Sequence, residues 1–447
     1  GRSAMSANTT GGENVAVGFA ALDANTTGSE NTALGRSALT TATTAQYNTA
    51  VGYGAMDATT TGNQNTAVGA LSLDANTTGA ANVAMGVGAL GSNTTASNNT
   101  ALGYAALNIN TTGDQNVAVG KSALQNNTTA SQNTAVGREA LFANTTGADN
   151  VAVGSASLYS NTTGHNHTAV GRSAMINNTT GTHSTALGST ALQANTTGGA
   201  NVAVGSRAME ATTTGSSNAV VGYKALLANT TGEGNVSVGR DALLYNTTGD
   251  NNVAIGRTAL ENVTTGYRNV GVGQYAGAGI TTGLTNVCIG YSAGSGSGNI
   301  SQNLFISRSN SQPHQAATWI HGDSNGVCYQ GNNSSSWGTS SDERIKKDIV
   351  DSSNGLAKID AIQVRNFNYR TQEEITASGL TSCDASGLQT GVIAQELETV
   401  LPNAVTASDS GQKRVNTDPI FWAMVKAIQE LSAQNTALAA RITTLEG

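Results

Sequence analysis

The sequence predicts a mainly β fold, in which a long parallel β-solenoid precedes a small α+β domain that ends in a coiled coil. Three observations support this prediction: a 17-residue motif recurs along most of the chain, only 11% of the 447 residues are charged, and charge and helical patterns rise abruptly near residue 341. An ordinary globular protein has about 25% charged residues. With 54 Gly, 3 Pro and 4% aromatic residues, this chain has the composition of a repetitive backbone scaffold.

Glycine marks the repeat, because it occurs at every 17th position from Gly18 to Gly290 without an insertion. Each copy holds a β-branched apolar run, a second apolar patch such as Ala21-Leu22, and an Asn-Thr-Thr-Gly type of turn. Gly, Asn and Thr inside every window disfavour helix, and the prolines lie outside the repeat, which suits ladder pairing. We therefore expect one coil per repeat, with two short strands and two turns, over residues 1–298.

Polar columns and a thin apolar interior follow from the same register. Asn14 begins a column that is Asn in every copy except His167 and Ser184. We expect the Asn and Thr columns to form side-chain ladders that satisfy the backbone groups of the turns. Each coil offers about one Val, one Leu and a few Ala to its interior, and Cys288, which replaces an Ala, should be buried. Such an interior is thin for a free-standing solenoid, so we expect three chains to associate along the axis.

The motif Asn48-Thr49-Ala50-Val51-Gly52 and its relatives resemble the head repeats of YadA-like trimeric adhesins. The resemblance covers about 290 residues. It implies a left-handed parallel β-roll within a homotrimer. Residues 299–340 then form a Gly-, Ser- and Asn-rich connector or tip, expected to be β-rich, in which Trp319 and Trp337 favour a role in the trimer core over ligand binding.

A helix is predicted over 419–446, with Asp418 as its cap and Pro419 in its first turn. Apolar residues recur at alternating spacings of three and four, which is typical of a coiled-coil seam. The seam consists of Phe421, Met424, Ile428, Leu431, Asn435, Leu438, Ile442 and Leu445. Its single polar member, Asn435, would fix register and strand number at some cost in stability. The alternative is a helix that packs only on its own domain.

Four short motifs follow one another near the C-terminus. They are Ser341-Asp342-Glu343-Arg344-Ile345-Lys346, Ala394-Gln395-Glu396, Leu401-Pro402-Asn403-Ala404-Val405 and Ala427-Ile428-Gln429-Glu430-Leu431. Their order across 341–447 closely resembles the C-terminal intramolecular chaperone domain of phage endosialidases and tail fibres. The resemblance implies a domain that trimerises, drives the folding of the β-rich stalk before it, and then cuts itself off.

The resemblance also assigns the chemistry of that cut. Ser341 would attack the carbonyl of Ser340 and break the chain between them, with Asp342 and Arg344 orienting the site. A serine hydroxyl needs a base, and burial lowers the pKa of a lysine until it can act as one. Lys346 lies five residues after Ser341, so a turn or short helix can bring the two together. Without the resemblance, the segment is typical of a capped, solvated helix start.

The composition excludes several other functions. With a net charge of −7, the chain has no basic surface typical of nucleic-acid binding. No apolar run approaches the ~20 residues of a membrane-spanning helix. The five His show no ligand spacing with Cys, so we expect no metal or cofactor. We expect no enzymatic activity beyond self-cleavage. The favoured function is a tail fibre on a phage virion that contacts other tail proteins and a host cell-surface receptor, a glycan.

Two alternatives remain: a trimeric adhesin on a bacterial surface, and a solenoid that binds ice or another surface through its paired Thr columns. The column after each turn Gly is rich in Arg and Tyr, as at Arg36, Tyr53 and Arg257. This column is either a solubilising outer ridge or a grip for a polysaccharide.

Overall fold

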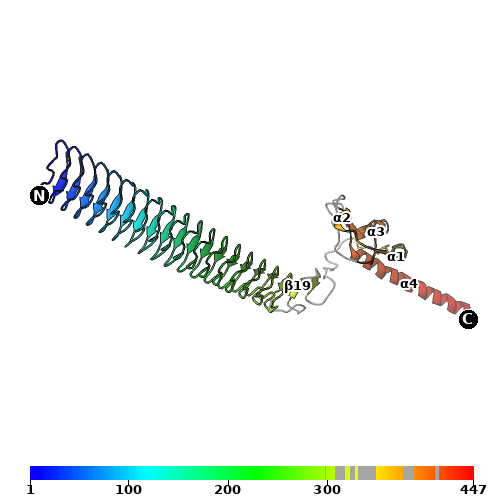
Figure 1. Cartoon of the computed structure of the whole chain (residues 1–447). Coiled ribbons are helices and arrows are strands. Elements are labelled where there is room, and N and C mark those ends of the chain that lie inside the picture. The colour runs from blue at the N-terminus through cyan, green and yellow to red at the C-terminus, as the bar shows by residue number, and fades with distance from the viewer. Residues whose placement is uncertain are drawn as a thin grey trace. The chain divides into compact units, whose positions relative to one another are not determined.

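The computed structural model describes residues 1–296, 298–307, 318–322, 328–330, 349–375, 387–407 and 412–446. The chain divides into two compact units, Gly1–Trp337 and Gly338–Gly447. The first is the β-solenoid seen in blue to green in Figure 1, and the second carries the helices. In the described part of the chain, no helix is both long and apolar enough to span a membrane.

The solenoid gives one three-residue strand for each of seventeen repeats. The strands are β1 (Val15–Val17), β2 (Thr32–Leu34), β3 (Thr49–Val51), β4 (Thr66–Val68), β5 (Val83–Met85), β6 (Thr100–Leu102), β7 (Val117–Val119), β8 (Thr134–Val136), β9 (Val151–Val153), β10 (Thr168–Val170), β11 (Thr185–Leu187), β12 (Val202–Val204), β13 (Ala219–Val221), β14 (Val236–Val238), β15 (Val253–Ile255), β16 (Val270–Val272) and β17 (Val287–Ile289). Each pairs in parallel with the next, as Val15 does with Thr32. The predicted mainly β, parallel solenoid fold is thereby confirmed.

The turn Gly is required because neighbouring coils approach closely at this position. Gly18 has φ +144°, and a Cβ there would lie 2.3 Å from the carbonyl oxygen of Gly35 in the next coil. The same close approach recurs along the column, from Gly35 to Gly52 and onward. A side chain at this position would push two coils apart, which explains why Gly occupies it in all seventeen copies.

The second strand expected in each coil is not formed in the described coils. The patch around Ala21 instead runs through residues in the left-handed region, with φ 54° at Ala20 and 52° at Leu22. The Leu22 N–H still donates to the Ala38 carbonyl in the next coil, at 2.9 Å. The chain therefore keeps the hydrogen bonds between coils while it turns, and burial of the Leu22 side chain helps to offset the unfavourable φ.

Ala and Leu fill the interior of most coils, and the strand Val that we expected there lies outside in all of them except at Val220. Ala33 at the centre of β2 and Leu39 in the following turn are both fully buried, whereas Val17 is 54% and Leu34 is 47% exposed. Side chains alternate between the two faces of a strand. An inward Ala at the middle position therefore places both flanking side chains on the outer face.

The predicted polar ladders are confirmed. The Asn31 backbone N–H donates to Oδ1 of Asn14 at 2.9 Å, and its Nδ2 donates to the Ala45 carbonyl at 2.8 Å. A second ladder joins Asn93 to Asn76 at 3.0 Å. The hydroxyl groups of the first Thr column donate to the backbone of the next coil. These bonds satisfy buried carbonyl and N–H groups that the short strands leave unpaired.

The stack continues beyond residue 298, where the sequence places the end of the shaft. Strand β18 (Leu304–Ser307) pairs in parallel with β17 in the same 17-residue register. Phe305 replaces the small inward residue of this strand and is fully buried. The strands β19 (Thr318–Gly322) and β20 (Cys328–Gln330) pair antiparallel, so the parallel stacking ends at β18.

The Leu column becomes glycine in the last two repeats, and the structure shows the reason. A Cβ at Gly294 would lie 2.7 Å from Sγ of Cys288 and 3.1 Å from the Phe305 ring. Cys288 and Phe305 are both fully buried, as predicted for the cysteine. These larger side chains fill the interior in place of the missing leucines.

The second unit is a small α+β arrangement with a long terminal helix. Its elements are α1 (Leu356–Asp360), β21 (Arg365–Phe367), α2 (Gln372–Ile375), β22 (Gln389–Gly391), α3 (Ala394–Val400), the 3-10 helix η3 (Pro402–Ala404), β23 (Val405–Ala407), β24 (Lys413–Val415) and α4 (Thr417–Glu446). Two antiparallel pairs form, β21 with β22 and β23 with β24. Leu397, Leu401, Ala404 and Ala423 form the buried core.

Candidate functional site

The residues predicted to carry out the cleavage lie outside the described residues. These are Ser340, Ser341, Asp342, Arg344 and Lys346. Their roles therefore stay predictions. The structure does describe the elements that contain the three later motifs, and it shows what those motif residues contact.

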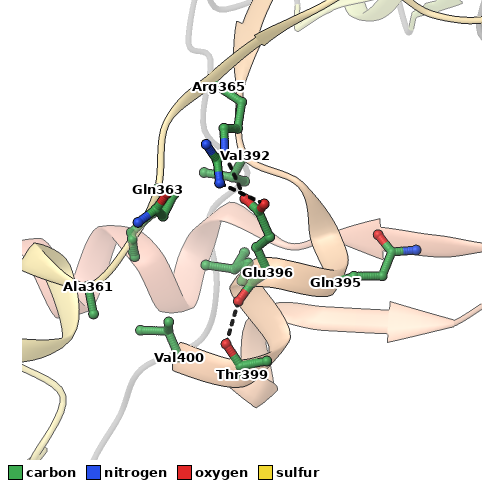
Figure 2. A pocket seen from close by; sticks show the side chains of 10 residues that line it. Ala361, Gln363, Arg365, Val392, Gln395, Glu396, Thr399 and Val400 are labelled. Carbon is green, nitrogen blue, oxygen red and sulfur yellow. Dashed lines mark hydrogen bonds and ion pairs between the residues drawn. The ribbon is translucent and has the colours of Figure 1, made fainter.

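The Ala-Gln-Glu motif forms the first turn of α3, and its glutamate binds an arginine on β21. Glu396 accepts two hydrogen bonds from Arg365, at 2.9 and 3.1 Å, and its backbone carbonyl accepts a bond from Thr399 at 2.7 Å (Figure 2). The hydrogen bond and charge of Glu396 raise the pKa of Arg365, so the guanidinium stays charged. Both side chains are nearly half exposed, so the pair orients α3 against β21 more than it stabilises the fold.

A pocket opens beside this ion pair. It is lined by Ala361, Ile362, Gln363, Arg365, Val392, Gln395, Glu396, Leu397, Thr399 and Val400. The one carboxylate among them is engaged by Arg365, and the lining contains no Ser-Lys pair. No group of three or more His, Cys, Asp or Glu that could hold a metal occurs in the described segments. The described pocket therefore does not contain the Ser-Lys pair that the predicted cut requires.

The last motif joins α4 to α1 through Glu430. Its Oε2 accepts a hydrogen bond from the Leu356 N–H at 2.7 Å, at the start of α1. The N-cap residue, Gly355, has no side chain to do this, and a Cβ there would lie 2.1 Å from Oε1 of Glu430. The sequence showed Glu430 only as a motif residue. Gly355 cannot cap α1 with a side chain, and the acid that does so lies far away in the sequence. No local sequence pattern therefore indicates this contact.

One further contact was not predicted. Lys413 on β24 forms an ion pair with Glu398 on α3. Together with Arg365 and Glu430, this pair ties α3 and α4 to the rest of the unit. Charged residues of the second and fourth motifs thus form contacts that hold the elements of the small domain together.

The terminal helix is confirmed, and only its first part is buried. Ala423 and Ala427 pack against the domain, while the seam side chains are exposed. Their exposed fractions are 65% for Ile428, 46% for Leu431, 53% for Leu438, 46% for Ile442 and 84% for Leu445. Asn435 is exposed as well. The apolar seam of α4 therefore remains exposed in the single chain.

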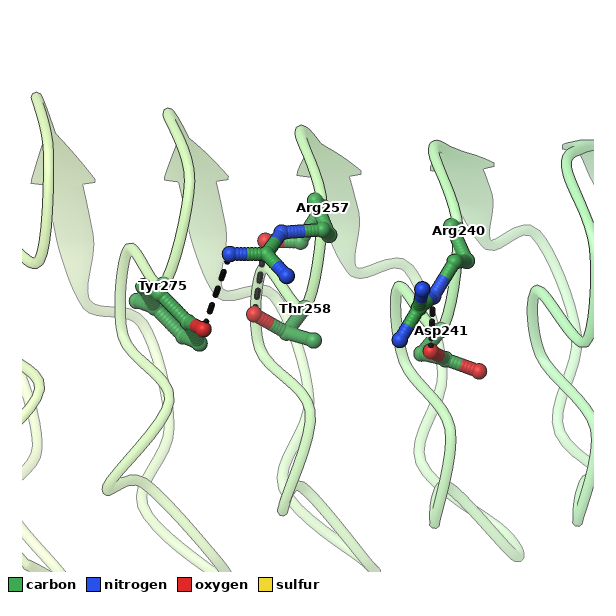
Figure 3. A network of polar contacts seen from close by, with 5 residues as sticks. All are labelled: Arg240, Asp241, Arg257, Thr258 and Tyr275. Carbon is green, nitrogen blue, oxygen red and sulfur yellow. Dashed lines mark hydrogen bonds and ion pairs between the residues drawn. The ribbon is translucent and has the colours of Figure 1, made fainter.

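The solenoid carries a second notable surface, the Arg- and Tyr-rich column. Arg257 donates to the Tyr275 hydroxyl at 2.9 Å and lies 5.1 Å from its ring, and Arg240 pairs with Asp241 (Figure 3). Arg36 lies near the rings of both neighbouring aromatic residues of its column. Cationic and aromatic side chains of neighbouring coils thus contact one another around Arg36 and at Arg257, whose partner Tyr275 lies one position beyond the column.

The comparison with known protein families agrees with this architecture. A family model described as the chaperone of endosialidase matches residues 341–406. The match begins at Ser341 and includes the Arg365 to Glu396 contact. No curated protein and no solved structure matches the chain. The protein therefore combines a 17-turn parallel β-solenoid with a C-terminal unit of the endosialidase-chaperone kind.

Proposed function

We propose that this chain is a phage tail-fibre or tail-spike shaft whose C-terminal domain drives trimerisation and folding and then removes itself. The observation that carries the proposal is the endosialidase-chaperone match at 341–406, placed directly after a long β-solenoid. In a solenoid each repeat contacts only its neighbours, so folding can nucleate at one end and propagate from coil to coil. A dedicated chaperone at the C-terminus would supply that nucleus.

The proposed removal is a cleavage within one chain. The Ser341 hydroxyl attacks the Ser340 carbonyl carbon while Lys346 takes the hydroxyl proton, and the peptide C–N bond breaks as its nitrogen is protonated. Water then hydrolyses the resulting ester. The products are a stalk that ends in the Ser340 carboxylate and a chaperone that begins with the Ser341 amine. The start of the family match at Ser341 supports this position.

Substitutions test the cleavage directly. Ser341→Ala and Lys346→Ala should each leave one uncut chain, and Ser340→Ala should cut nearly normally because only its carbonyl reacts. Lys347→Ala is the matched control, since it removes the adjacent lysine and should cut as wild type does. Mass spectrometry of the purified chains gives the result. Efficient cutting by Ser341→Ala would remove Ser341 as the nucleophile.

The outer face of the strands supports association along the shaft. The third residue of every strand from β1 to β17 is Val, Leu, Met or Ile, and many of these side chains are substantially exposed. At ~4.8 Å per coil, the stripe runs roughly 80 Å. Soluble monomers rarely expose contiguous apolar patches of more than a few hundred Å², so a stripe that follows the whole solenoid favours an association surface. Other copies of the same chain, carrying the same stripe in the same register, are the occupants that fit it.

The number of chains in this assembly is three, by resemblance to YadA-like heads and to the endosialidase chaperone. The seam of α4 continues the association at the C-terminus. Asn435 within it supplies the polar contact that selects strand number. The assembled protein belongs on the virion, where it would contact other tail proteins and a host glycan.

The Arg and Tyr ridge is the surface we assign to that host contact. Tyrosine rings offer flat apolar faces, and the neighbouring guanidinium groups are already fixed by partners such as Asp241 and Tyr275. Loss of glycan or cell binding in an Arg257→Ala, Tyr275→Ala variant that still assembles would support this, and unchanged binding would return the ridge to a solubilising role.

A bacterial trimeric adhesin is the alternative, because the same solenoid would serve it. The chaperone match favours the phage function. Ice binding is disfavoured by one contact: the Thr26 hydroxyl donates to the Thr43 carbonyl at 3.0 Å, so this Thr column bonds to backbone instead of facing water.

A further inference from the structure

His167 occupies a position that is Asn in fifteen of the seventeen repeats. In a regular coil the amide of this column serves two neighbours at once. Asn150 donates from Nδ2 to the Gly164 carbonyl at 3.0 Å, and its Oδ1 accepts from the backbone N–H of the next coil, also at 3.0 Å. One side chain thus provides both a donor and an acceptor inside the solenoid.

The imidazole of His167 reproduces this pattern with its two ring nitrogens. Nδ1 accepts from the Ser184 N–H at 3.2 Å, and Nε2 donates to the Gly181 carbonyl at 2.5 Å. Only the neutral ring with its proton on Nε2 can do both. His167 is 1% exposed, so water cannot replace either bond. The next member of the column is the smaller Ser184, which continues the ladder by accepting from Asn201.

We propose that His167 makes the contact between β10 and β11 an acid-sensitive joint in the solenoid, which opens locally at mildly acidic pH while the other coils stay closed. Protonation of Nδ1 would turn the acceptor into a donor that faces the Ser184 N–H. That N–H would lose its partner, and a charge would enter a ladder of neutral amides. The Asn side chains at the other positions of this column do not titrate.

The surroundings of His167 strengthen this response. Burial lowers the pKa of His167, and so do His165 and His183, whose charges would have the same sign; the bond that Nε2 donates to the Gly181 carbonyl acts in the opposite direction. His165 and His183 are exposed, with ring centroids 5.3 Å apart.

The direction of the pH effect follows from linkage. Because the folded pKa is lowered, the opened coil binds a proton more readily than the closed one. The closed state therefore loses stability as pH falls below about 6.5, by up to about tenfold in the opening equilibrium per pH unit, until the folded pKa is reached.

Hydrogen exchange of the full chain tests the joint. Exchange would be measured at pH 7.5, 6.5 and 5.5, corrected for intrinsic rates, in peptides that cover 182–190 and, for comparison, 133–150. Between pH 6.5 and 5.5, protection of 182–190 should fall by up to about tenfold in the wild type and by much less at 133–150. His167→Asn should abolish the difference, and His183→Asn, which removes an exposed ring, should retain it.

A second variant controls for the effect of placing the new amide beside the small side chain of Ser184. His167→Asn with Ser184→Asn restores both exceptions to the regular column and should likewise show no pH response at 182–190. An equal response of both peptides in the wild type would overturn the proposal. So would a response that persists in the double variant.

Discussion

At the residue scale, the protein relies on buried amides that bond from coil to coil. The Asn column was evident in the sequence because its spacing never varies, and the ladder follows from the need to pair buried backbone groups. The left-handed turn at Ala20 and Leu22 was not evident in the sequence, because neither residue favours positive φ by itself. There, contacts between coils override the local preference.

Replacement of one ladder amide should destabilise the solenoid measurably. In Asn133→Ala the Asn150 N–H loses its partner at 3.0 Å, and the Gly147 carbonyl keeps only the bond from Asn144 at 2.9 Å. The orphaned N–H costs about 1–3 kcal/mol. Thermal unfolding should shift down accordingly, whereas Thr146→Ala, at an exposed turn position of the same coil, should change it little. Equal shifts for the two variants would contradict the ladder.

The thiol of Cys288 should be inert in the folded protein. Burial raises its pKa to about 12, so at pH 8 the thiolate fraction is about a thousandfold lower than for an exposed thiol. Peptide-level mass spectrometry after alkylation at pH 8 should show little labelling at Cys288 before denaturation and full labelling after it. Rapid labelling of the native chain would show that the last coils open readily.

At the element scale, α4 combines two functions that the sequence treated as alternatives. Its first turns pack on the domain through Ala423 and Ala427, and the rest presents an apolar seam. Spacing alone predicted the seam, because the coiled-coil period is local. The contact from Glu430 to Leu356 spans 74 residues and could not be predicted from spacing.

Charges in the seam should prevent assembly. Leu431→Asp with Leu438→Asp should give monomeric or aggregated protein, because an unpaired charge is costly to bury between helices. Ala433→Asp with Ala440→Asp places the same charges on exposed positions outside the seam and should leave the oligomer intact. Analytical ultracentrifugation distinguishes the outcomes. A normal trimer in the Leu431, Leu438 variant would exclude the seam as the assembly surface.

At the scale of the whole molecule, the fold could be predicted because it is one unit repeated without insertion. The chemistry could be predicted only by resemblance, since Ser341 and Lys346 belong to a short polar segment whose composition alone indicates a helix start. The number of apolar residues in a coil does not show which face of the strand each of them occupies. For this reason the outward-facing Val stripe was not predicted from the sequence.

Removal of one whole repeat should shorten the solenoid without unfolding it. Deletion of 116–132 joins Gln115 to Asn133 and preserves every column, so the product should be soluble and about 4.8 Å shorter. Deletion of 116–123 removes half a coil, breaks the ladders and should abolish folding. Circular dichroism and small-angle scattering compare the two. If both deletions fold equally well, the register is not what holds the solenoid together.

The intact mass of the purified wild-type protein tests most directly whether the C-terminal unit leaves the stalk. We predict two species, a stalk ending at Ser340 and a fragment 341–447 whose N-terminal sequence begins Ser-Asp-Glu-Arg. A single uncut chain of 44.9 kDa in the assembled protein would contradict it and leave the unit as a permanent assembly cap.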